Sequence, residues 1–463
     1  MHRSSYPSAS WLCRLAARAV LLAPGILIAC AQDATSPPAL DATAASLETA
    51  SLAQEVRLLT AQRAIGALHR PAPVRPALVR LGRMLAFDKE LSGNRDISCM
   101  TCHLPGMGTG DARSLSIGQG GQGVGAARTH PDGVFIPRNA PPAFNLTSLT
   151  SFFWDGRVTA VNGRVHTPAV HRITPAMEQV FEFGALSALP LFPVLSRLEM
   201  RGDAGNELTG FRDDNPQQVW RDLMRRLGEI PEYRRLFESA YPGTRFSQMT
   251  FAHASNAIAG FLIDQFAFND SPWDRFLAGD DLALSDVELR GAKNFMSARC
   301  SICHTGAALT DNAFHNVAVA QIGPGTGDGP GGTDDYGRMR ITGDPRDRYA
   351  FRTPALRNVE LTAPYGHNGA ITDLRDFIAH YSESDTRLMA YDAGQLEPLL
   401  RGTVQPTFAA ILAARDTLLD GVVFTEQQID EVTAYMRALT DPRARNLDAV
   451  VPDRVPSGLP IDR

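Results

Sequence analysis

The chain has 463 residues, of which 44% are hydrophobic and 21% are charged, and its formal net charge is −5. This length is more than one compact core usually serves, so we expect two domains. The composition is ordinary for a globular protein, and the absence of a basic excess argues against nucleic acid as a partner.

The first 29 residues have the pattern of a lipoprotein-type signal peptide. Three arginines precede an apolar run at 19–29, which is too short to span a bilayer. The run ends in Leu-Ile-Ala before Cys30, a sequence similar to a bacterial lipobox, whose cysteine becomes the lipidated first residue. The alternative is an ordinary secretory signal with an incidental cysteine. From the lipobox-like sequence we expect a periplasmic protein anchored to the outer or inner membrane through Cys30, with a flexible tether over 30–60.

The first half of the remaining chain combines helices with long loops. Leu78, Leu81 and Leu85 recur at helical spacing, which predicts a short amphipathic helix leading toward Cys99. Residues 104–150 are rich in Gly, Pro and Asn and predict loops, and 158–210 predict irregular structure with short helices. Residues 247–277 predict a further helical region.

A second unit of similar design begins near residue 281. Ser285 and Glu288 form a capping-box pattern that opens a helix toward Cys300, and Thr425 opens the final helix in the same way. Strand-period runs are lacking. The sequence thus predicts a mostly α fold with long loops, organised as domains 61–280 and 281–441 and a polar, Pro-rich tail at 442–463.

Two motifs of identical spacing carry the chemistry. They are C-x-x-C-H sequences at 99–103 and 300–304. This spacing lets two thioethers hold a haem while the adjacent histidine coordinates the iron. A redox cysteine pair and a zinc site are the alternatives, but zinc requires four ligands around one metal, and here each pair has its own histidine. We expect two covalently bound haem c groups in cytochrome c-like domains, with these ligands: Cys99, Cys102 and His103; Cys300, Cys303 and His304.

Several further motifs follow in a recognisable order. They are the segment 81–103 that ends in the first C-x-x-C-H, Ser-Ile-Gly-Gln at 116–119, Pro-Arg-Asn at 137–139, Phe-Trp-Asp-Gly-Arg at 153–157, Phe-Arg-Thr-Pro-Ala-Leu-Arg-Asn at 351–358 and Leu-Thr-Ala-Pro-Tyr at 361–365. Over residues 76–440 the chain resembles the bacterial di-haem cytochrome c peroxidase and MauG superfamily. The resemblance implies a peroxidase that reduces hydrogen peroxide at its first haem, and family members are often homodimers.

The resemblance also assigns roles around the first haem. Gln119 occupies the loop position where the peroxidases often place a histidine ligand, which implies a first haem open to peroxide without reductive activation. Gln122 and His130 are alternative ligands from the same loop. Glu199 matches the distal glutamate of the family. Its role there is chemical: a carboxylate of raised pKa can move a proton between the two peroxide oxygens. Glu178 is the alternative.

Two more positions concern the region between the haems. Trp154 matches a tryptophan that relays electrons in the family, although a buried core aromatic is the default interpretation. Asn139, Thr362 and Pro364 match a calcium site, for which oxygen ligands are suitable.

The distal ligand of the second haem separates the two branches of the superfamily. The position that holds Met in the peroxidases is Tyr381 here, as in MauG-type proteins. A phenolate stabilises oxidised iron by its negative charge. His380 is the competing ligand, and His367 and Met389 are weaker candidates.

Three functions therefore remain open. One is a MauG-like oxidase that draws electrons from a protein substrate. Another is a peroxidase that detoxifies peroxide with electrons from a small cytochrome or cupredoxin. The last is a non-enzymatic di-haem electron carrier. Gln119 and Tyr381 favour the first of these.

Overall fold

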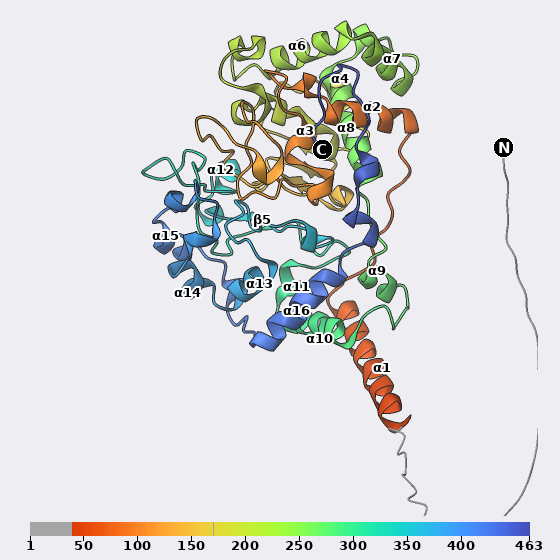
Figure 1. The fold of residues 1–463 in the computed structure, drawn as a ribbon, viewed down its shortest axis with the longest axis vertical. Helices are drawn as coiled ribbons and strands as arrows, with labels where there is room; N and C mark the ends of the chain where they lie inside the picture. The colour runs from red at the N-terminus through yellow and green to blue at the C-terminus, as the bar shows by residue number, and fades with distance from the viewer. Residues whose placement is uncertain (1–38, 170) are drawn as a thin grey trace, which may run out of the picture. The chain divides into compact units, whose positions relative to one another are not determined.

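A computed structural model describes residues 39–169 and 171–463, and side chains from Glu48 onward. The expected signal peptide and Cys30 lie outside these residues. The described chain is mostly α, as predicted (Figure 1). In the described part, every helix is too short or too polar to cross a membrane. The longer helices are α1 (Ala39–Gln62), α2 (Pro76–Phe87), α6 (Pro216–Glu229), α7 (Pro231–Ala240), α8 (Phe251–Gln265), α10 (Asp286–Ser297), α13 (Leu374–Ser382) and α16 (Glu426–Ala438).

Short elements join these helices. The short helices are α3 (Cys99–Cys102), α4 (Pro175–Glu178), α5 (Ala185–Ala188), α9 (Pro272–Leu277), α11 (Cys300–Cys303), α12 (Met339–Thr342), α14 (Ser384–Met389) and α15 (Phe408–Ala413). The strands are β1 (Ser151–Phe152), β2 (Val158–Val161), β3 (Arg164–His166), β4 (Phe314–His315) and β5 (Phe351–Arg352). β1, β2 and β3 form one antiparallel sheet in that order, and β4 pairs antiparallel with β5.

Each C-x-x-C-H motif follows a helix that is packed tightly against a closing helix (Figure 1). α2 crosses α8 at Gly82, where an added Cβ would lie 1.9 Å from the carbonyl oxygen of Ala257. α10 crosses α16 at Gly291, where an added Cβ would lie 1.9 Å from the carbonyl oxygen of Glu431. Only glycine permits such close backbone approach. The capping boxes predicted at Ser285 and Thr425 open α10 and α16.

Two large hydrophobic clusters form the core of the unit that spans Leu47–Arg463. The first cluster is built around α2, α5, α6, α7 and α8, and it surrounds α3. The second is built around α10, α13 and α16, and it surrounds α11. The division at 280/281 that we drew from the sequence remains a prediction.

Two terminal segments differ from their predictions. The segment expected to be a flexible tether over 30–60 is helical from Ala39, and Ala53 and Val56 are buried in the second cluster. The segment 442–463 is not a free polar tail, because Leu447, Val450 and Val455 are buried in the first cluster. Sparse apolar residues in a polar, Pro-rich segment gave no helical or strand period, so their burial could not be inferred from pattern.

Asp462 fixes the C-terminal segment to the first C-x-x-C-H motif. One carboxylate oxygen accepts a hydrogen bond from the hydroxyl of Thr101 at 2.6 Å, and the other lies 2.7 Å from Nζ of Lys89. All three side chains are buried. The end of the chain therefore stabilises the helical turn that carries both cysteines of the first motif.

Replacing Asp462 tests this contact. Asp462→Ala is expected to lower the free energy of unfolding by about 3 kcal/mol, because it leaves the buried Lys89 ammonium without its partner. The measurement is urea unfolding of the protein with both haems attached. Asp453→Ala is the control, because Asp453 is an exposed carboxylate in the same segment. Equal stability of the two variants would contradict the assignment.

Candidate functional site

The two C-x-x-C-H motifs share one local geometry. Both occupy a single helical turn, α3 or α11. Nδ1 of His103 lies 3.1 Å from the carbonyl oxygen of Thr109, and Nδ1 of His304 lies 3.0 Å from that of Leu309. A hydrogen bond from Nδ1 to a carbonyl fixes the ring and leaves Nε2 free as an iron ligand.

The cysteines themselves argue against thiol redox chemistry. Among the described residues, Cys99, Cys102, Cys300 and Cys303 form no disulfide. Burial raises the pKa of Cys99 to about 12 and that of Cys300 to about 12. A reactive cysteine pair needs a lowered thiol pKa, because the thiolate is the nucleophile. Raised thiol pKa values at Cys99 and Cys300, each in a motif with an oriented histidine, fit thioether attachment of haem instead.

A large apolar cavity opens beside the second motif. Its empty volume, including the mouth, is about 1560 Å³. Cys300, Cys303 and His304 line one part of it, and Trp154 and Tyr381 line others. Size, apolar lining and the three attachment residues fit a covalently bound haem.

Tyr381 and His380 are neighbours on α13 but face different surroundings. Successive helical residues point about 100° apart, so the two side chains cannot both face the cavity. Tyr381 lines the cavity, whereas Nε2 of His380 lies 2.7 Å from the carbonyl oxygen of Val317 and can donate to it. Burial raises the pKa of the Tyr381 hydroxyl. A cation such as ferric iron would oppose this shift and favour the phenolate.

The two weaker candidates for the distal ligand of the second haem, Met389 and His367, also differ in position. Met389 is 61% exposed, and it does not line the cavity. His367 does line it, with its ring stacked on Phe351 at a centroid distance of 3.5 Å. Burial lowers the pKa of His367 to about 3, so the imidazole is neutral.

Glu199 lies close to the first cysteine pair. It is half-buried in a π-helical turn, Arg197–Arg201, a conformation that is frequent at functional sites. Burial raises its carboxyl pKa. After burial, the charge of Glu199 is among the causes that raise the thiol pKa of both Cys99 and Cys102. The alternative, Glu178, is exposed on α4.

Gln119 is held directly against the Glu199 segment. Its backbone N–H donates to the carbonyl of Glu199 at 2.9 Å, and its side-chain Oε1 accepts from the backbone N–H of Asn94 at 3.3 Å. The preceding Gly118 allows this approach, because an added Cβ would lie 1.8 Å from the carbonyl oxygen of Leu198. The predicted loop residue and the predicted glutamate thus belong to one structural unit.

The other two loop candidates, Gln122 and His130, make hydrogen bonds within their own loop. Gln122 is exposed, and its backbone pairs with Thr129. Nδ1 of His130 accepts a hydrogen bond from the backbone N–H of Asp132 at 3.1 Å.

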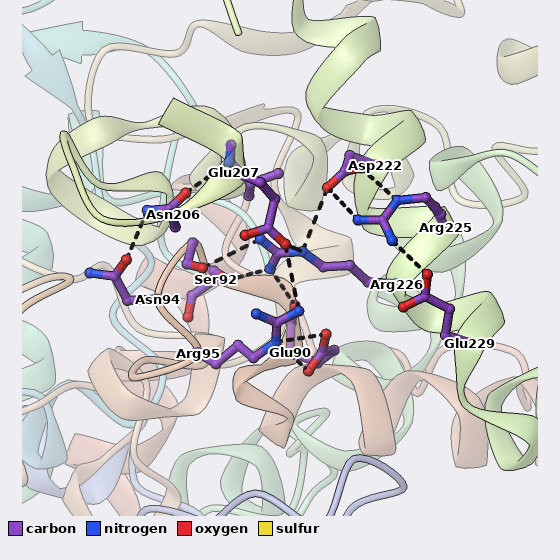
Figure 2. Close-up of polar contacts among 12 residues, drawn as sticks. Glu90, Ser92, Asn94, Arg95, Asn206, Glu207, Asp222, Arg225, Arg226 and Glu229 are labelled. Carbon is purple, nitrogen blue, oxygen red and sulfur yellow. Dashed lines mark hydrogen bonds and ion pairs between the residues drawn. The ribbon is translucent and has the colours of Figure 1, made fainter. Parts of the chain in front are cut away.

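A buried arginine on α6 fixes the segments that precede Cys99 and follow Glu199 (Figure 2). Arg226 is 1% exposed. Its guanidinium donates to the carbonyl of Ser92 at 2.8 Å and lies 2.8 Å from a carboxylate oxygen of Glu207. Gly93 then donates its backbone N–H to the carbonyl of Met200 at 2.7 Å. Arg226 is therefore a positioning residue for the Glu199 segment.

Arg226 and its neighbour Arg225 provide a matched pair for a test. Arg226→Gln is expected to cost about 2 kcal/mol or more of stability, because each buried backbone carbonyl left unpaired costs about 1–3 kcal/mol. Arg225→Gln is expected to cost less than about 1 kcal/mol, because its side chain is 51% exposed and its ion pairs with Asp222 and Glu229 are at the surface. Urea unfolding measures both, and equal losses would contradict the assignment.

Trp154 lies at the second cavity. Its indole Nε1–H donates to the carbonyl oxygen of Asn139 at 2.9 Å, and the side chain is buried. Asn139, Thr362 and Pro364, the predicted calcium residues, line the same cavity. The structure therefore brings these four predicted residues together.

Sequence reasoning missed the charged residues that line the cavity, among them His315 and Arg352. The ring nitrogens of His315 lie 2.5 Å from a carboxylate oxygen of Asp416 and 2.9 Å from one of Asp311. Hydrogen bonding, that to Asp311 foremost, raises the pKa of His315 to about 11. A lone histidine in the sequence gives no signal of such contacts. Arg352 stands within a motif that we recognised, but the motif did not reveal its surroundings.

The atoms near His315 do not make a convincing separate metal site. Ligand atoms of Cys303, Asp311 and His315 lie within 4.8 Å of one another. However, Cys303 belongs to the haem-attachment motif, and both ring nitrogens of His315 already face carboxylates.

Comparison with known proteins identifies the class. Residues 76–282 match the family described as di-haem cytochrome c peroxidase. Cytochrome c551 peroxidase of Pseudomonas aeruginosa is 32% identical over 312 residues, which cover 67% of this chain and 73% of the relative. Methylamine utilization protein MauG of Methylorubrum extorquens is 28% identical over 313 residues, with 67% and 69% coverage.

A solved structure agrees with these sequence relationships. A MauG-like protein associated with microbial copper homeostasis superposes with a TM-score of 0.57 at 25% identity, over 84% of this chain and 96% of that one. The chain belongs to the di-haem cytochrome c peroxidase and MauG family. It is a di-haem peroxidase, as the sequence predicted.

Proposed function

We propose that this chain is a MauG-like peroxidase, in which peroxide reacts at the haem of His103 and Tyr381 ligates the iron of the second haem. The observation that carries this proposal is the position of Tyr381. It lines the second cavity, whereas His380 faces the carbonyl of Val317 and Met389 is exposed. Electrons then come from a protein substrate. The alternative donor is a small cytochrome or cupredoxin.

The chain's own residues have distinct tasks in this proposal. When bound, the haem supplies the iron at which the peroxide O–O bond breaks. Glu199 accepts a proton from the inner peroxide oxygen and delivers it to the outer one. Gln119 keeps its amide oxygen on the backbone of Asn94, which supports a first haem open to peroxide. Trp154 is the proposed electron relay between the haems.

Low-temperature EPR of the as-isolated ferric protein tests the proposal. We expect a high-spin signal from the first haem beside a low-spin signal from the second. Both signals should diminish after one equivalent of peroxide. Two low-spin signals that do not respond to peroxide would overturn the proposal and favour a closed first haem, as in an enzyme that needs prior reduction or in an electron carrier.

The proposal includes a calcium ion near Asn139, Thr362 and Pro364. Their common position at the cavity supports it, because side-chain and backbone oxygens are suitable calcium ligands. Metal analysis of purified protein before and after chelation is the test, and a calcium content well below one ion per chain would contradict it.

We also propose a periplasmic lipoprotein anchored at Cys30. The support is the apolar run at 19–29 followed by the lipobox-like sequence. Cell fractionation and mass spectrometry should find a lipidated Cys30 in membranes, and Cys30→Ser should release the protein. An unmodified Cys30 would contradict the proposal.

A further inference from the structure

We propose that Arg352 binds a propionate of the second haem and thereby raises the reduction potential of that haem. Membership of the family implies the haem itself, but the role of Arg352 is inferred from its surroundings in this chain. The inference does not depend on how peroxide reacts at the first haem.

Among the residues that the structure describes, Arg352 is a buried cation without an anionic partner. Its side chain is 5% exposed. Nε donates to the carbonyl of Phe153 at 3.4 Å, and a terminal nitrogen donates to the carbonyl of Thr353 at 3.1 Å. In the described part of the chain, no carboxylate lies within ion-pair distance of it. Burial alone lowers the pKa of Arg352 to about 10.

Other buried arginines of the same region are paired. Arg138 lies 2.5 Å from a carboxylate oxygen of Asp155 and 2.6 Å from one of Asp335. Arg357 lies 2.9 Å from a carboxylate oxygen of Asp274. Buried charges in proteins are normally paired in this way, because desolvation is otherwise too costly. The unpaired state of Arg352 therefore indicates that a bound group supplies the anion.

The position of Arg352 identifies that group. Arg352 lines the same cavity as Cys300, Cys303 and His304. Its backbone is fixed by pairing of β5 with β4 and by a hydrogen bond from its N–H to the carbonyl of Trp154 at 2.8 Å. The anionic groups of a haem are its two propionates, and a guanidinium binds carboxylates in a fork geometry that an ammonium cannot reproduce.

The pairing has a direct electrostatic consequence. A haem gains one electron on reduction, so a nearby positive charge favours the reduced state and a nearby negative charge favours the oxidised state. Arg352 neutralises the propionate. Its loss leaves that negative charge in a low-dielectric cavity, which lowers the potential of the second haem.

Arg352→Gln is the decisive variant, measured by an optical and EPR redox titration without peroxide. The midpoint potential of the second haem should fall, while that of the first haem stays unchanged. In Arg352→Lys the midpoint potential of the second haem should return most of the way to its wild-type value. Arg338→Gln is the matched control, because Arg338 donates to the carbonyls of Asp155 and Gly156 in the neighbouring segment but does not line the cavity.

Each result of these measurements either supports or overturns the inference about Arg352. An unchanged potential in Arg352→Gln with both haems attached, or an equal fall in Arg338→Gln, would overturn the inference. A wild-type potential that follows chloride concentration at constant ionic strength would also overturn it, by assigning Arg352 to a free anion. If Arg352→Gln loses the second haem, Arg352→Lys decides: retention of the haem supports the ion pair, and loss in both variants refutes it. Failure of the EPR test at the first haem would leave these measurements intact.

Discussion

Glu199→Gln is expected to slow the reaction with peroxide by about 10²–10⁴-fold, the usual contribution of a positioned acid–base group. Glutamine has nearly the same shape but cannot accept the proton from the inner peroxide oxygen. Stopped-flow absorbance of the ferric protein mixed with peroxide measures the rate. Both haems should remain attached, because Glu199 is not part of either C-x-x-C-H motif.

The pH dependence of the wild type gives an independent check on Glu199. Burial raises the pKa of this carboxyl above its ordinary value. Since Glu199 must be ionised to accept a proton, the rate should fall as the pH drops through the raised pKa, and Glu199→Gln should lose this dependence. Glu178→Gln is the control, because Glu178 is exposed on α4. Normal peroxide kinetics in Glu199→Gln would remove Glu199 from the mechanism.

Tyr381→Met is expected to raise the reduction potential of the second haem by a few tenths of a volt, since axial ligands set haem potentials over a range of about 0.8 V. A phenolate stabilises ferric iron by its charge, whereas a neutral thioether favours the ferrous state. A spectroscopically monitored redox titration measures the change, and the high-spin signal of the first haem should be unaffected.

His380→Gln is the matched control for this change. Glutamine retains a donor for the carbonyl of Val317, the partner of Nε2 of His380. If Tyr381 is the ligand, this variant should leave the potential of the second haem near its wild-type value. An unchanged potential in Tyr381→Met together with a shifted potential in His380→Gln would instead identify His380 as the ligand.

Local patterns predicted the helices that lead into and close each half. Leu78, Leu81 and Leu85 face the first core from α2, and the capping boxes at Ser285 and Thr425 open α10 and α16. These predictions succeeded because helical periodicity and capping depend on residues only a few positions apart. The predicted helical region 247–277 is interrupted, since α8 ends at Gln265 and α9 begins at Pro272.

The contacts of the C-terminal segment could not be predicted from such local patterns. Asp462 lies far along the chain from Lys89 and Thr101, and their contact depends on the whole path of the chain between them. The same holds for Arg226, whose partners lie on the segments near Ser92 and Glu207. Neither residue stands in a motif that predicts these contacts.

The amino-acid sequence alone was enough to predict the chemistry of haem attachment, because C-x-x-C-H places two thiols and an imidazole within one helical turn whatever surrounds them. It also determined the family, because several separated motifs keep a common order. The choice between Tyr381 and His380 at the second cavity became clear only from the fold, as did the burial of Arg352 there with no carboxylate of the described residues in ion-pair distance. Both depend on contacts between distant segments, and burial and pairing at such contacts decide whether a side chain can serve a haem.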